Sequence, residues 1–356
     1  MTRLNKRVFS LLLVAGLFAP AAFAGSKDNP HDMLMKSFQQ GSLWTQGPVK
    51  LAAKVSLLKA KPDGSNIDLD YTLSWAGPEK WRSEWTANGF DQVNVLNNNK
   101  LSSFSSQPKP LVQLLQLEMA VAALDAANPA GPYTIPPLDW EKPKGDATKK
   151  KVNNIDAKCI AVGDPQESFC IDPATGHILS VVITVANAEI GSFEYSDYTT
   201  SGTTAYPQTI KVFYAKTQLE EAKLTVTRDD KFADTVFATP DKATTVDFPS
   251  CPDVAKNFTA PHVSKSVPAK EPDAAVKAKK FGLVWVLASV GKDGSVTKAD
   301  VIGGGDPDLV TVATAAVQQY KYTPYMRCGQ AVQFQVVVVV PFAPPQTKKP
   351  QDDIIG

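Results

Sequence analysis

Hydrophobic and polar residues alternate along two early segments of the chain, more clearly in the second. In Val49 to Leu57 every second residue is apolar, and in Ile67 to Trp75 the apolar side chains are separated by Asp, Asp, Thr and Ser. A period of two is typical of a β-strand with one face in a core and one in water. A Pro-Asp-Gly turn begins at Pro62, between the two segments. The pattern therefore predicts an antiparallel strand pair.

Further strand-like segments occupy the chain up to about residue 227. A third strand carries Trp81, Ser83 and Trp85, and the segment from Pro110 to Ala127 is apolar nearly all round, which predicts a helix buried on more than one side. Gly131 to Lys151 is rich in Pro, Gly and Lys and predicts a surface loop. The remaining strands are expected at Ala157–Val162, Ser168–Asp172, His177–Val185, Ala188–Tyr198, Ile210–Tyr214 and Ala222–Thr227.

The C-terminal region predicts a small mixed domain. A Lys-Asp-Gly turn at Lys292 to Gly294 separates two apolar runs, which indicates a β-hairpin. Asp306 then offers a helix N-cap, and Pro307 fits the first helical turn. A final strand is expected from Ala331 to Val340, and a short helix is expected near Asp273. The fold class is therefore α+β, with an N-terminal antiparallel sheet and a small α-β-β-α-β domain.

These C-terminal motifs carry a resemblance to a known family. The GKDGSV turn, the DPDL helix start and the AAVQQYKYTP helix exit resemble the TonB C-terminal domain, over residues 271–342. The resemblance implies that the last strand lies at a sheet edge, where it would pair with a strand of an envelope protein or with a second copy of the chain. The alternative is that the linker or the N-terminal domain covers this edge. The partner-binding residues expected there are Gln333, Phe334, Gln335, Val336 and Val337.

The N-terminal region, residues 31–248, resembles the LolA/LolB-type superfamily of periplasmic lipoprotein carriers. The likeness rests on WAGPEKWRSEW at 75–85, NNNKLSSF at 97–104 and SFEYSDY at 192–198. It implies a half-barrel whose concave apolar face binds a lipid, an acyl chain or another apolar ligand. The alternative is that this face is a closed core. The side chains assigned to the site are Leu69, Tyr71, Leu73, Trp75, Trp81 and Trp85.

The first 24 residues have the features of a cleaved secretory signal. Arg3, Lys6 and Arg7 precede an apolar stretch that ends in Ala-Phe-Ala at residues 22–24. Cleavage near Ala24 predicts export to the periplasm without a retained membrane helix, and a retained anchor is the alternative. Removal of this segment changes the net charge from +1 to −2. A nearly neutral chain argues against nucleic acid as a partner.

The chain contains four cysteines, an even number that predicts two disulfides in an exported protein. Cys159 and Cys170 flank a hairpin turn, and the pair left over is Cys251 with Cys328. Zinc binding is the alternative, which is weak because the sequence has no closely spaced Cys or His pair. The segment 249–270 reads as a Pro-rich linker, and 343–356 reads as a disordered tail.

No catalytic constellation is apparent in the sequence. The three histidines have no acid or nucleophile at a useful spacing, so no catalytic residue, metal site or cofactor is expected. The sequence therefore predicts a non-enzymatic periplasmic binding protein with a TonB-like interaction domain, in the context of outer-membrane transport. The alternative function is a periplasmic lipid or lipoprotein carrier.

Overall fold

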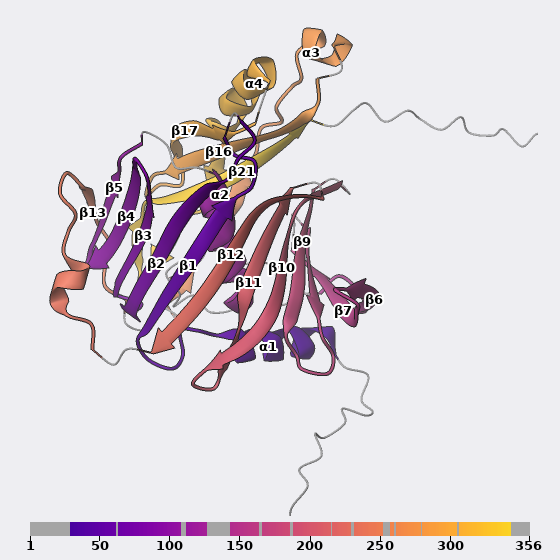
Figure 1. Ribbon diagram of the computed structural model, residues 1–356. Helices are drawn as coiled ribbons and strands as arrows, with labels where there is room; N and C mark the ends of the chain where they lie inside the picture. Colours follow the sequence, from indigo (N-terminus) through magenta and orange to yellow (C-terminus); the bar gives the residue numbers. More distant parts are fainter. Residues whose placement is uncertain are drawn as a thin grey trace, which may run out of the picture.

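Thirteen antiparallel strands form one open sheet in the N-terminal region (Figure 1). The computed structural model describes residues 29–342 except 62, 108–111, 127–142, 164–165, 186–187, 215, 229–230, 252–256, 260, 279 and 305. The predicted signal peptide and disordered tail lie outside these residues. The strand order is β13-β5-β4-β3-β2-β1-β12-β11-β10-β9-β8-β7-β6. The strands are β1 Val49–Leu57, β2 Ile67–Gly77, β3 Lys80–Ala87, β4 Phe90–Asn97, β5 Lys100–Ser105, β6 Thr148–Val152, β7 Ile155–Val162, β8 Gln166–Ile171, β9 Ile178–Val185, β10 Ala188–Ser201, β11 Thr204–Tyr214, β12 Thr217–Arg228 and β13 Thr244–Asp247.

Alternation places the core on one face of this sheet. In β1 every second residue is buried, from Val49 to Leu57, as the pattern predicted. Strand β1 pairs on one side with β2 and on the other with β12, which returns from far along the chain. The two halves of the meander therefore meet at β1, and their apolar faces form one continuous core.

Two helices cover the middle of this apolar face. The helix α1, Pro30–Gly41, begins at Asn29, whose side chain caps it, and buries Leu34 and Phe38. The helix α2, Val112–Ala122, continues into a short 3-10 helix η1, Ala123–Asp125, within the helical segment that the sequence predicted. On the opposite face of the sheet, Phe237 of the 3-10 helix η2, Asp234–Phe237, packs against two valines of β4.

The last residues of the segment Gly131 to Lys151, which was predicted to be a surface loop, form a strand. Residues up to 142 lie outside the described residues, but Lys149, Lys150 and Lys151 belong to β6, which is an end strand of the sheet. Their side chains are exposed. Lysines on an end strand oppose pairing with another chain, so this composition protects the sheet edge.

The C-terminal domain contains the predicted α-β-β-α-β order. Its helices are α3, Asp273–Lys277, and α4, Pro307–Val317. Its main sheet has the order β17-β16-β21. Gly294, in the predicted hairpin turn, has a φ of 78°, and a Cβ there would lie 1.9 Å from the Tyr322 carbonyl oxygen. The strands of this sheet are β16 Gly282–Val290, β17 Val296–Gly303 and β21 Phe334–Phe342.

Short strands join the linker to the C-terminal domain. The segment predicted as a linker contributes β14, which pairs with β19, and β15, which pairs with β18. The predicted last strand is divided, because Gln333 separates β20 from β21. The bounds of these short strands are β14 Phe258–Thr259, β15 Val263–Lys265, β18 Lys321–Tyr322, β19 Tyr325–Arg327 and β20 Gln330–Val332.

A buried carboxyl group on β12 generates the first testable prediction. Glu220 is fully buried, and neither carboxyl oxygen has a hydrogen-bond partner among the described residues. Burial raises the pKa of Glu220 to about 8. The folded protein then holds this proton where the unfolded chain releases it. The protonated Glu220 therefore contributes fully to the free energy of unfolding below the pKa that this group has in the unfolded chain. This contribution is lost as the pH rises toward 8.

The wild-type protein should lose up to about 3 kcal/mol of unfolding free energy between pH 5 and pH 8, and we expect the Glu220→Gln variant not to show this loss. Urea denaturation at the two pH values measures this loss. The control is Glu221→Gln, whose side chain pairs with Lys223 at the surface and should give no gain at pH 8. Equal stability changes for Glu220→Gln at both pH values would show that the carboxyl group is not protonated in the folded state.

Candidate functional site

Five of the six side chains assigned to an apolar ligand site lie in the closed core. Leu69, Tyr71, Leu73, Trp75 and Trp85 are at most 4% exposed and belong to the same cluster as the buried residues of α1 and α2. The Trp85 indole Nε1 donates a hydrogen bond of 3.0 Å to Glu118 of α2. Burial raises the pKa of Glu118 to about 7, against the effect of this hydrogen bond. This arrangement is the closed core that the sequence analysis kept as the alternative.

The sixth side chain, Trp81, lines a cavity between the two domains. The cavity has a volume of about 670 Å³. One wall is the core-facing side of the sheet, because Trp81 lies opposite Leu96 of β4, and Leu96 lies opposite Leu101 of β5. The C-terminal domain supplies the other wall, which includes Leu287 and Tyr325. The described part of the chain therefore has an open space on the predicted face, displaced toward β4, β5 and β13.

The predicted partner-binding residues lie at the start of an edge strand. Within the described residues β21 pairs only with β16, so its other side is the edge of the sheet. Phe334, Gln335, Val336 and Val337 belong to β21, whereas Gln333 precedes it. Gln333, Phe334 and Gln335 also line the interdomain cavity. The edge and the cavity are therefore adjacent.

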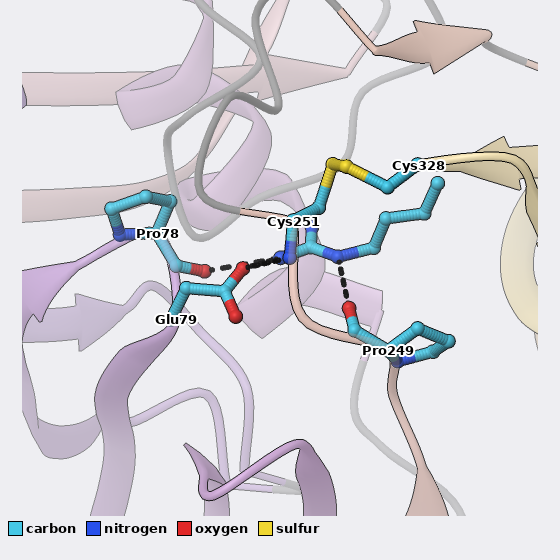
Figure 2. The surroundings of a disulfide bond; sticks show 6 residues. Pro78, Glu79, Pro249, Cys251 and Cys328 are labelled. Atoms are coloured by element: carbon cyan, nitrogen blue, oxygen red, sulfur yellow. Dashed lines mark hydrogen bonds and ion pairs between the residues drawn. A yellow bond between two sulfur atoms is a disulfide. The ribbon is translucent and has the colours of Figure 1, made fainter.

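A buried arginine connects the domains beside this cavity. The Arg327 Nη2 atom lies 2.6 Å from Oε1 of Glu79, and the Arg327 side chain is 5% exposed. Its Nε donates to the Pro249 carbonyl oxygen, and its guanidinium lies 4.4 Å from the Phe248 ring centroid. Glu79 Oε1 also accepts a hydrogen bond from the Cys251 backbone amide, next to the disulfide shown in Figure 2. We call Glu79, Arg327 and this disulfide the clasp.

The structure confirms both predicted disulfides. Cys159 and Cys170 face each other on the neighbouring strands β7 and β8. Cys251, which follows β13, is bonded to Cys328, in the turn between β19 and β20. The second disulfide joins the end of the N-terminal sheet to the C-terminal domain. None of the four sulfur atoms is available as a zinc ligand, since all are paired.

No sequence pattern predicts a functional role for three residues of this region, Glu79, Arg327 and Gln92. Glu79 and Arg327 lie 248 positions apart in the chain, so no local pattern links them. The available signal was the position of Arg327 next to a cysteine assigned to an interdomain disulfide. Gln92, which lines the cavity, falls on the same face as Trp85. A polar residue at a core-facing position of a strand is the signal that would have identified it.

Comparison with known protein families gives a match in the C-terminal region of the chain. Residues 271–344 match the family described as the C-terminal region of Gram-negative bacterial TonB proteins. This confirms the resemblance that the C-terminal motifs carried. Comparison with curated proteins gives no match.

Several solved structures are similar to the chain. A LolA superfamily protein from Nitrosomonas europaea has 15% identity and a TM-score of 0.40, over 59% of this chain and 97% of its own. A putative outer membrane lipoprotein-sorting protein domain from Vibrio parahaemolyticus has 11% identity and a TM-score of 0.38, over 60% and 97%. The MucA/MucB complex of Pseudomonas aeruginosa has 10% identity and a TM-score of 0.29, over 83% and 99%.

The described residues include neither a membrane-spanning helix nor a metal-ligand cluster. No helix among them has the length and apolar character needed to cross a membrane. In the same part of the chain, no group of three or more His, Cys, Asp or Glu side chains is arranged to hold a metal ion.

The clasp generates the second prediction. Glu79→Gln leaves the buried Arg327 guanidinium without its counter-charge, so we expect the unfolding free energy to fall by about 2–3 kcal/mol. Arg327→Met removes the cation itself. The double variant should therefore be more stable than the sum of the two single effects implies. Urea denaturation of the disulfide-bonded chain measures all three variants.

Glu84→Gln provides the matched control for this experiment. It breaks a more exposed ion pair with Arg82 within the N-terminal sheet, and its expected cost is below about 1 kcal/mol. If Glu79→Gln costs no more than this control, the clasp does not stabilise the contact between the domains.

Proposed function

We propose that this protein is a non-enzymatic binding protein of the periplasmic cell envelope, whose C-terminal domain binds a partner protein by strand addition at β21. The observation that carries the proposal is the edge position of β21 in a domain that matches the TonB C-terminal family. A partner strand at such an edge gains main-chain hydrogen bonds, while alternate side chains provide specificity. The signal-like first 24 residues support export to this compartment.

The composition of β21 favours this role over simple edge protection. The end strand β6 of the large sheet carries three consecutive exposed lysines. The strand β21 reads FQVVVVVPF and has no charged side chain. A long, uncharged and β-branched edge recruits other chains unless a partner covers it. Pairing with a partner strand is therefore a physical use for a sequence that would otherwise promote aggregation.

Acyl-chain or lipoprotein binding by the N-terminal domain remains the alternative function. Its support is the apolar face of β2 and β3, where Leu73 and Trp85 are fully buried. Because α1 and α2 belong to the same core, an acyl chain would have to displace packed helical side chains to reach this face. Strand addition at β21 requires no such displacement, and for this reason we place it first.

Proline substitution in β21 provides the third prediction. Successive residues of a strand direct their N–H groups to opposite sides, so Val336→Pro and Val337→Pro remove donors from opposite sides of the strand. One variant breaks the ladder with β16 and should destabilise the domain. The other removes only a donor at the free edge and should retain stability but lose partner binding. A photo-crosslinker placed at the exposed Gln335 in cells measures the binding.

Amide exchange of the isolated monomer serves as the control for this prediction. Alternate amides from Phe334 to Val339 should exchange quickly, because only one side of β21 is paired. Full protection of this segment in the monomer would show that the edge is already covered. Crosslinks that persist in both proline variants would also contradict strand addition.

A further inference from the structure

A hairpin at one end of the large sheet concentrates positive charge. Between Lys144 and Lys158 the chain carries five lysines and two aspartates, although the chain without its first 24 residues has a net charge of −2. Strands β6 and β7 of this segment lie at the opposite end of the sheet from β13 and β5, which border the C-terminal domain (Figure 1). We call β6, β7 and the turn between them the basic hairpin. Its charge is local and lies away from the contact between the domains.

Lysine side chains face one another across the basic hairpin. Lys149 lies directly opposite Lys158, and Lys151 shares their face of the sheet. Like charges at directly opposed positions destabilise a strand pair. Elsewhere in the same sheet Lys54 forms an ion pair with an aspartate. Lys149 and Lys151 form no ion pair with a described residue, although Asp156 lies across from Lys151.

Protection of the sheet edge accounts for only part of this charge. Lysines on the end strand β6 oppose pairing with another chain. Lys158, however, lies on β7, an inner strand that pairs with both β6 and β8, where no edge needs protection. Its repulsion with Lys149 is a cost that edge protection does not require. Negative groups placed against this face would convert the repulsion into attraction.

The tip of the basic hairpin presents an apolar side chain beside the lysines. Asn153 and Asn154 have φ values of 48° and 66°, which form a tight turn. Ile155, the next residue, is 37% exposed, and the described part of the chain has only two other large apolar side chains with such exposure. An apolar residue at a projecting tip with lysines behind it suits a lipid surface. Lysines there reach the phosphate groups, while the apolar group enters the headgroup region.

We propose that the basic hairpin docks onto an anionic lipid surface, with its lysines at lipid phosphate groups and Ile155 in the headgroup region. An acidic protein would match the lysines but would need a recess shaped for Ile155, whereas a lipid surface accommodates a single apolar residue without one. A nucleic acid is disfavoured because the rest of the chain is acidic overall. The docking does not depend on strand addition at β21.

The test uses the chain from Gly25 onward and vesicles of phosphatidylglycerol and phosphatidylethanolamine in equal amounts. Vesicles of phosphatidylcholine provide the neutral surface. Co-sedimentation should detect binding to the anionic vesicles only, and the binding should weaken as the salt concentration rises. Each lysine near an anionic surface contributes about a fivefold gain in binding, so removal of three should weaken it about a hundredfold. The variant that removes them is Lys149→Gln with Lys150→Gln and Lys151→Gln.

Ile155→Ser tests the apolar tip separately. The variant should bind anionic vesicles several-fold more weakly than the wild-type chain, because an apolar contact with the headgroup region is lost. Its salt dependence should stay that of the wild-type chain, since the lysines are unchanged. The triple lysine variant should instead show a weaker salt dependence. Thermal unfolding of each variant verifies that it folds.

The matched control removes three exposed lysines elsewhere in the N-terminal domain and has the same net charge as the hairpin variant. It is Lys50→Gln with Lys59→Gln and Lys61→Gln. This control should bind anionic vesicles as the wild-type chain does. Equal losses in the hairpin and control variants, equal binding to neutral and anionic vesicles, or no binding to vesicles would each overturn the proposal. Binding of an oligoglutamate peptide without binding of vesicles would overturn it in favour of an acidic protein partner.

Discussion

The apolar face of the thirteen-stranded sheet is the constraint on which the rest of the structure depends. An open sheet with one apolar face is stable in water only when another layer covers that face. The helices α1 and α2 cover its middle, where Leu51, Leu73 and Ile210 are fully buried. Trp81 of β3 and the facing residues of β4 and β5 border the cavity against the C-terminal domain instead. The second domain therefore completes the first, and the incomplete fit between them leaves the cavity.

Buried polar groups in this protein have three different environments, and each has a different consequence. The Arg327 guanidinium is paired with Glu79 and with main-chain carbonyl groups, so its charge is compensated and it joins the domains. The Glu220 carboxyl group has no partner among the described residues, so burial favours its protonated form. The Gln92 amide cannot change its charge, and its Oε1 atom is buried without a partner among the described residues although the residue borders the interdomain cavity.

The sequence predicted local structure well where one periodicity dominated. The bounds of β1 match the alternating segment Val49 to Leu57, because its burial follows from contacts on both neighbouring strands. The turn at Gly294 was also predictable, since a positive φ and a close carbonyl oxygen demand glycine. The cavity was not predictable, because it depends on how two separately folded surfaces meet. Trp81 and Trp85 lie on the same strand face, yet one borders the cavity and the other is core, according to which layer covers each position.

Docking between the domains also determines which surfaces of the C-terminal sheet remain available. On β16, Val284, Val286 and Ala288 face α4 and share its core. On the opposite face, Leu283 of β16 and Val339 of β21 pack against the N-terminal core. With both faces covered, association with another chain can use only the edges of this sheet. The β17 edge carries Lys298 and Asp300, which form an ion pair, whereas β21 is uncharged. Because charged side chains disfavour pairing at a sheet edge, fusion to the N-terminal domain leaves β21 as the edge best suited to strand addition.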